Sequence, residues 1–89
     1  MQRRKIEVFG QVQGVGFRYF TERLAQKYNI TGTVQNVEQH VEIYAQGEEN
    51  DLKQFTQAVI DGASPASNVT DYNIEQQDTD PSLTRFRTI

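Results

Sequence analysis

The sequence has little of the side-chain chemistry that most enzymes use, because its 89 residues include no cysteine and one histidine. The lack of cysteine excludes disulfide bonds, thiol nucleophiles, iron–sulfur clusters and cysteine-bound zinc. A single histidine, His40, argues against a Ser-His-Asp triad and against a histidine-based metal site. We therefore expect neither a metal nor another cofactor.

The sequence also lacks long apolar runs. No stretch could span a membrane, and the basic residues 3–5 are followed by an alternating segment rather than by the apolar core of a secretion signal. A chain of this length holds one hydrophobic core, so residues 1–89 are predicted to form a single domain. We expect a cytoplasmic monomer without a membrane partner.

Positive charge is scarce and unevenly placed. The net charge is -3, yet six of the nine basic residues lie in residues 1–28, whereas ten of the 12 acidic residues follow them. An acidic chain repels the nucleic-acid backbone unless its bases gather on one surface, so no nucleic-acid partner is expected. An anion would need a local site, and the first thirty residues are the place to look for it.

Hydrophobic periodicity predicts the element order β-α-β-β-α-β. Strands are expected at 5–12, 32–37, 41–45 and 69–74 with a bulge in the last, helices at 17–28 and from about 48–51 to Gly62, and a short edge strand within 83–89. Two helices of this length cannot cover both faces of the sheet, so they should pack on one face. With right-handed crossovers, this predicts an α+β, ferredoxin-like split β-α-β sandwich with an antiparallel sheet.

Two local features of these elements can be tested directly. The first helix should pack through a stripe of apolar residues at three- and four-residue steps, and Asn29 should end it in a left-handed conformation. The predicted stripe consists of Phe17, Phe20, Leu24 and Tyr28. Residues 38–40 should form the turn of a hairpin, with His40 exposed at its tip rather than acting as a base.

The segment that points to chemistry is residues 10–18, which lies between the first strand and the first helix. Gly14 and Gly16 allow consecutive backbone N–H groups to converge, and the helix dipole adds partial positive charge at the same place. Arg18 supplies a forked, permanently charged donor that suits phosphate oxygens. The alternative is a tight glycine turn followed by a solvated arginine, and the loop alone does not decide between the two.

Two motifs together resemble a known family. Residues 10–18, preceded by Val8, resemble the first signature of the acylphosphatases, and residues 32–36 resemble the second. The resemblance extends through Phe86 and implies a ferredoxin-like enzyme that hydrolyses acyl phosphates to a carboxylate and inorganic phosphate without a metal. It also implies that Asn36 orients the attacking water. The implied phosphate-binding residues are Gly14, Val15, Gly16, Phe17 and Arg18.

The predicted strand places Asn36 on the same face as Val34, at a position that alternation gives to buried residues. A buried amide needs a partner, and a positioned water can be one. By itself, Asn36 is better explained as a strand-end residue that enters the hairpin, and only its spacing from the loop motif favours the functional interpretation. The leaving carboxylate of an acyl phosphate is a weak base, so this reaction needs no general acid, and the lack of cysteine and histidine is no obstacle.

Some residues depart from the family pattern or support no site. Thr33 stands where the family usually has an aromatic residue, and the hairpin after Asn36 is one residue shorter and lacks the usual glycine. Asp78 and Asp80 have a calcium-like spacing without the remaining ligands. The expected partner is a small-molecule acyl phosphate. The alternative function is a non-catalytic phosphate- or anion-binding module on the same fold.

Overall fold

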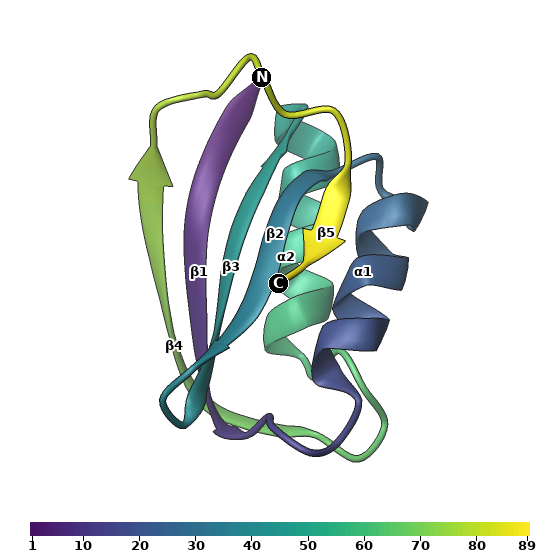
Figure 1. Cartoon of the computed structure of the whole chain (residues 1–89), viewed down its shortest axis with the longest axis vertical. Helices are drawn as coiled ribbons and strands as arrows, with labels where there is room; N and C mark the ends of the chain where they lie inside the picture. Colours follow the sequence, from purple (N-terminus) through teal and green to yellow (C-terminus); the bar gives the residue numbers. More distant parts are fainter.

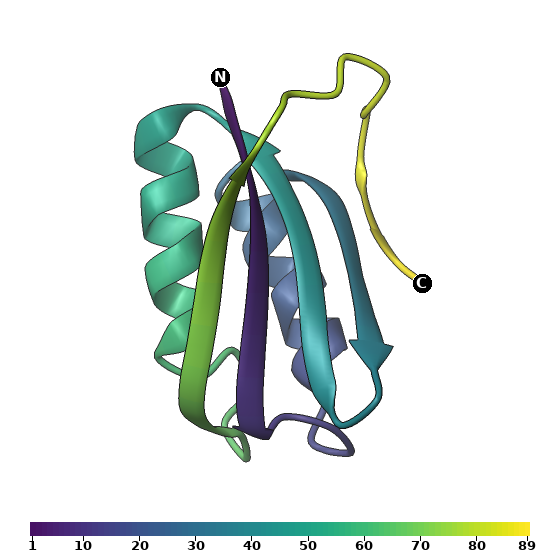
Figure 2. The same ribbon diagram turned by 90° about the vertical axis from the view of Figure 1, so that its left-hand side faces the viewer.

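The computed structural model describes residues 1–89, and it contains five strands and two helices (Figure 1). Along the chain these are β1 (Gln2–Gln11), α1 (Phe17–Lys27), β2 (Thr31–Val37), β3 (His40–Gly47), α2 (Glu49–Ile60), β4 (Asn68–Gln77) and β5 (Phe86–Thr88). The strands form one sheet in the order β4-β1-β3-β2-β5. Both helices lie against the same face of this sheet (Figures 1 and 2), so the predicted ferredoxin-like sandwich is confirmed.

The prediction of a purely antiparallel sheet was wrong at one edge. Strands β1 to β4 pair antiparallel, but β5 pairs parallel to β2, with Phe86 opposite Gly32. The reason is the connection, because the segment after β4 crosses one end of the molecule to the opposite edge of the sheet (Figure 2). The chain then enters β5 in the direction in which β2 already runs. The expected bulge in β4 is present, where the pairing with β1 shifts between Phe9 and Gly10.

The core fills the space between the sheet and the two helices. Thirteen buried hydrophobic residues form one cluster. Helix α1 contributes Phe17 and Ala25, with the buried Thr21 between them, and α2 contributes Leu52, Phe55 and Val59. The stripe predicted for α1 was wrong at Phe20, which lies outside the cluster, whereas Leu24 and Tyr28 are partly buried and pack against it as expected. Residues four apart at 17, 21 and 25 face the sheet directly, which turns residue 20 to the side.

The ends of α1 and of the hairpin depend on two left-handed residues. Asn29 has φ 58°, and the N–H of Ile30 donates to the carbonyl of Ala25 at 2.8 Å, which confirms the predicted helix ending. The hairpin turn is tighter than expected. Val37 pairs with His40, so only Glu38 and Gln39 remain in the turn, and Glu38 takes φ 55°. His40 therefore belongs to β3 rather than to an exposed tip.

No helix has the length and apolar character needed to cross a bilayer.

Candidate active site

A hollow of about 340 Å³ opens where the loop after β1 meets the start of α1, the end of β2 and the edge strand β5. Its lining residues come from segments far apart in the sequence. They are Val12, Gln13, Gly14, Gly16, Phe17, Arg18, Tyr19, Glu22, Asn36 and Thr88. The hollow is therefore lined by residues from both motifs that the sequence singled out.

The loop between β1 and α1 presents free backbone donors. Gly14 and Gly16 have φ 73° and 77°, which a residue with a side chain would adopt only under strain. None of the N–H groups of residues 13–16 donates to a backbone carbonyl, and the first helical bond runs from Phe20 N to Gly16 O at 3.1 Å. The first turn of α1 adds further N–H groups without partners. Such a group of donors suits an anion of the size of phosphate.

Two apolar side chains anchor the loop on the core. Val15 does not line the hollow, because its side chain packs against the core cluster. Phe17, which follows the second glycine, is only 1% exposed. The loop thus rests on two apolar residues while its backbone faces the hollow, so an incoming anion would meet donors that are already held in place.

Arg18 is the only cationic residue that lines the hollow. Its side chain is exposed, and its guanidinium takes part in no ion pair. The other arginine of α1, Arg23, does not line the hollow. It donates to the hydroxyl of the lining residue Tyr19 at 3.1 Å and lies 5.8 Å from the centre of that ring. The guanidinium of Arg18 is therefore free to bind an anion held by the loop.

Asn36 reaches the hollow from β2, but it is exposed, and the expectation that its amide is buried was wrong. Val34, two residues earlier on the same strand face, is fully buried. The difference arises because α1 begins only at Phe17, so the layer beside the end of β2 is the open glycine loop and not a packed helix. The structure brings Asn36 to the same hollow as Arg18 and the loop, with its amide available to a ligand or water.

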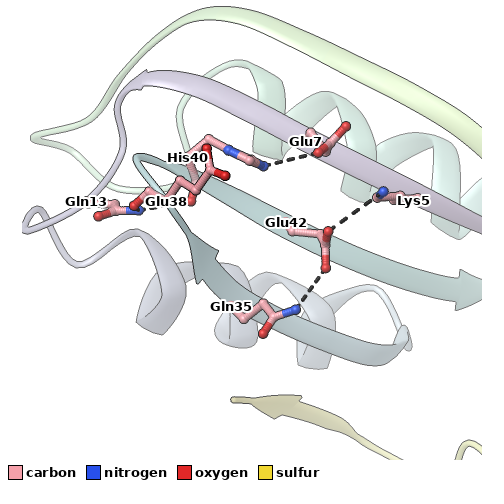
Figure 3. A network of polar contacts seen from close by, with 7 residues as sticks. All are labelled: Lys5, Glu7, Gln13, Gln35, Glu38, His40 and Glu42. Carbon is pink, nitrogen blue, oxygen red and sulfur yellow. Dashed lines mark hydrogen bonds and ion pairs between the residues drawn. The ribbon is translucent and has the colours of Figure 1, made fainter.

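Gln13 makes a contact that the sequence did not predict. Its side-chain amide donates to the carbonyl oxygen of Glu38 at 3.0 Å and to that of His40 at 3.0 Å (Figure 3). These two bonds tie the glycine loop to the hairpin that carries Asn36. The only sequence signal for this role was a glutamine among glycines and valines, so Gln13 was not identified in advance. Glu22 and Thr88, which also line the hollow, were missed as well.

His40 lies on the face of the sheet that the helices leave open. Its side chain is 15% exposed, its Nε2 is 3.1 Å from Oε2 of Glu7, and its ring stacks on Phe9 with the centroids 4.8 Å apart. The expectation of an exposed residue without a carboxylate partner was therefore wrong. The pairing depends on β1 lying beside β3, which the hairpin sequence alone does not reveal. Since His40 does not line the hollow, it takes no part in the candidate site.

A second ion pair continues this polar network along the open face. Lys5 Nζ is 3.8 Å from Glu42 Oε2, and Glu42 also accepts a hydrogen bond of 2.8 Å from Gln35 (Figure 3). The neighbouring Tyr44, followed by Glu7, favours the charged ammonium and raises the pKa of Lys5 above its usual value of 10.5. These charges compensate one another, and none of them lines the hollow.

The acidic residues form no cluster suited to a cation. No three His, Cys, Asp or Glu side chains lie close enough together to hold a metal ion. Asp80 instead caps the turn that follows it, because its Oδ1 accepts hydrogen bonds from the backbone N–H of Ser82 at 3.0 Å and from its hydroxyl at 2.6 Å. These bonds lower the pKa of Asp80 below its usual 3.8.

Comparison with known proteins places this geometry in a family, because the acylphosphatase family model matches residues 4–88. The chain belongs to the acylphosphatase family. An acylphosphatase of Staphylococcus aureus (strain Newman) is 60% identical over 84 residues, which span 94% of each chain. The crystal structure of the Bacillus subtilis acylphosphatase is 42% identical with a TM-score of 0.94, and the match covers 100% of this chain and 99% of that one.

The acylphosphatase fold also occurs inside a larger protein. Full-length HypF, solved in its phosphate- and nucleotide-bound form, matches 99% of this chain at 33% identity with a TM-score of 0.91, but the match covers only 12% of HypF. The acylphosphatase of Coxiella burnetii is 29% identical, and its TM-score is also 0.91. The layers and strand order described above are therefore those of the acylphosphatase family.

Proposed function

We propose that this protein hydrolyses the carboxyl–phosphate bond of small acyl phosphates and releases a carboxylate and inorganic phosphate. The observation that carries the proposal is the hollow, in which free loop amides, the unpaired guanidinium of Arg18 and the amide of Asn36 lie together. Membership of the acylphosphatase family supports the same reaction. Residues 1–89 act in this proposal as one domain, and a monomer in the cytoplasm stays a prediction.

The loop and Arg18 hold the phosphoryl group in this mechanism. Backbone N–H groups and a guanidinium stabilise the negative charge of the three equatorial oxygens as the transition state forms, which is most of what phosphoryl transfer requires. Because the loop rests on the core, these donors need little rearrangement when the substrate binds. The residues assigned to phosphate binding are Gly14, Val15, Gly16, Phe17 and Arg18.

Asn36 orients the attacking water. The oxygen of this water forms a bond to phosphorus while the bond between phosphorus and the acyl oxygen breaks, and the carboxylate leaves with the electron pair. The proton of the water passes to the phosphate product or to solvent. The leaving carboxylate has a pKa of about 4 as a free acid, so it departs without a proton donor. No general acid is required, which agrees with the lack of a suitable histidine at the hollow.

The first experiment measures the hydrolysis of benzoyl phosphate in the presence of EDTA by wild-type protein and by Arg18→Ala. Loss of Arg18 should lower kcat/KM by about 100-fold or more, by analogy with the removal of one oxyanion donor. Both KM and kcat should change, because Arg18 contacts the same oxygens in substrate and transition state. Lys27→Ala removes a positive charge from the last turn of the same helix, away from the residues that line the hollow, and should retain wild-type activity. Wild-type turnover no faster than that of Arg18→Ala would refute the proposal.

The second experiment separates catalysis from anion binding. Asn36→Ala should lower kcat and leave KM almost unchanged, because Asn36 contacts the water rather than the phosphoryl group. Asn73→Ala, on the exposed edge strand β4, is the matched control. The non-catalytic module would give a different result. Wild-type protein would bind inorganic phosphate but hydrolyse acyl phosphates no faster than background, and Asn36→Ala would change neither the binding nor the rate.

A further inference from the structure

Glu22 places a negative charge inside a hollow suited to anions. It lies one helical turn after Arg18 and is the only acidic residue among those that line the hollow. The hydroxyl of Thr88 in β5 donates a hydrogen bond of 2.6 Å to Oε2 of Glu22. No family motif quoted above includes either residue, and the proposed hydrolysis uses neither.

The Thr88 hydroxyl holds this carboxylate away from Arg18. Residues four apart on a helix are neighbours, so Glu22 and Arg18 could form an ion pair along α1. The structure contains no such pair, and the carboxylate is bonded toward β5 instead. The guanidinium thus stays free for the phosphoryl group, while the negative charge of Glu22 stays in the hollow without being neutralised.

Glu22 also lies where the hollow continues beyond the loop. It lines a second hollow of about 640 Å³, which follows α1 toward Asn29 and is bounded on the other side by residues 84–86, among them the cationic Arg85. The phosphoryl group occupies the end with the loop amides and Arg18. An acyl group that extends from there along α1 meets the Glu22 carboxylate first.

We propose that Glu22, held by Thr88, is a specificity-determining residue that disfavours acyl phosphates whose acyl group carries its own negative charge. This inference rests on the proposed hydrolysis. The preferred substrates are then acyl phosphates with neutral or cationic acyl groups, because a second carboxylate in the hollow is repelled by Glu22. Arg18 cannot offset this repulsion, because it is occupied by the phosphoryl group. Arg85 lines only the second hollow, whereas Glu22 lines both, so Glu22 is the charge nearer to the phosphoryl group.

The test compares Glu22→Gln with wild-type protein on benzoyl phosphate, whose acyl group is neutral, and on succinyl phosphate, whose acyl group carries a carboxylate. Glutamine keeps an oxygen that can accept the Thr88 hydrogen bond, so the variant removes the charge and little else. The value of kcat/KM should rise for both substrates, because the charge of Glu22 also repels the anionic phosphoryl group. The ratio of kcat/KM for succinyl over benzoyl phosphate should rise about three- to tenfold, the size expected for one charge in a partly solvated site.

Two controls isolate the charge of Glu22. Glu75→Gln makes the same change on β4, at the opposite edge of the sheet, and should leave the ratio at its wild-type value. High salt should reduce the increase in this ratio that Glu22→Gln produces, because exposed charges are screened. If wild-type protein hydrolyses neither substrate, the proposed function fails. If it hydrolyses both and Glu22→Gln does not change the ratio, only the inference about Glu22 fails.

A second variant tests the role of Thr88 as a positioning residue. Thr88→Val frees the Glu22 carboxylate to reach Arg18, so KM for both substrates should rise about two- to threefold. Adding Glu22→Gln to Thr88→Val should restore the KM of Glu22→Gln alone. A KM that stays at the wild-type value in Thr88→Val, or one that the second substitution does not restore, would overturn this positioning role.

Discussion

Replacing Gln13 by alanine removes the two hydrogen bonds that join the glycine loop to the hairpin. An intramolecular hydrogen bond contributes a net 0.5–1.5 kcal/mol, roughly, to the stability of a protein. The bond to the Glu38 carbonyl is exposed, so water can replace it and its share is small, whereas the bond to the His40 carbonyl is partly buried. We therefore expect Gln13→Ala to lose about 1–2 kcal/mol of unfolding free energy.

Thermal and urea unfolding measure this loss. For a domain of this size the expected fall in Tm is about 5–15 °C, and the urea midpoint should fall without a change in slope. Because the two bonds also fix the loop relative to Asn36, kcat for benzoyl phosphate should decrease several-fold. The control is Gln39→Ala, because Gln39 lies exposed in the hairpin turn, and its Tm should equal that of the wild type. A Gln13→Ala protein that melts within about a degree of Gln39→Ala would refute the reasoning.

Three further predictions concern the loop, the turn after β4 and the core. Gly16→Ala should lower the free energy of unfolding by about 1–3 kcal/mol, because φ 77° strains any residue with a side chain. Crowding is not the cause, since the nearest atoms beyond the two neighbouring residues are ring carbons of Phe20 at 3.7 Å from the added carbon. Inorganic phosphate should inhibit this variant more weakly than the wild type, and an unchanged inhibition constant would contradict the prediction. The stability that Asp80 contributes is present above its usual pKa of 3.8 and is lost as the pH falls through its lowered pKa. The urea midpoint of the wild type should therefore exceed that of Ser82→Ala near neutral pH, and the difference should vanish in strong acid. A difference that persists in strong acid would argue against this cause. Thr21→Val should leave the urea midpoint unchanged or raise it, because the Thr21 hydroxyl is buried without a hydrogen-bond partner, and a clear decrease would show that the hydroxyl is satisfied in solution.

The sequence was sufficient for most features that depend on neighbours along the chain, although the place of Phe20 on α1 and the extent of the hairpin turn were predicted wrongly. Hydrophobic periodicity located β1 and α2 to within a few residues of their observed bounds, and Asn29 ends α1 as expected. These features are local, because each depends on residues within a few positions of one another. The same is true of the glycine loop, whose position before α1 follows directly from its sequence.

The polar contacts that the sequence did not reveal join distant segments. The pair of His40 with Glu7 and the bonds from Gln13 to the hairpin span 25 to 33 residues. Periodicity shows which face of a strand is buried, but not which polar side chains meet across strands. The exposure of Asn36 was missed for a related reason, since it depends on where α1 begins beside β2. That position is set by packing rather than by either segment alone.

The bonds from Gln13 end on main-chain oxygens, and this has a consequence for how the hairpin tip can vary. Carbonyl oxygens at positions 38 and 40 are present whatever residues stand there, so the loop imposes no requirement on side-chain identity at the tip. It does impose one on length. A residue inserted between Val37 and His40 would move both carbonyls relative to the glutamine and release the loop from the hairpin. The two bonds from Gln13 thus depend on the length of this turn and not on its side chains, although the left-handed φ of Glu38 still restricts which residues fit at position 38.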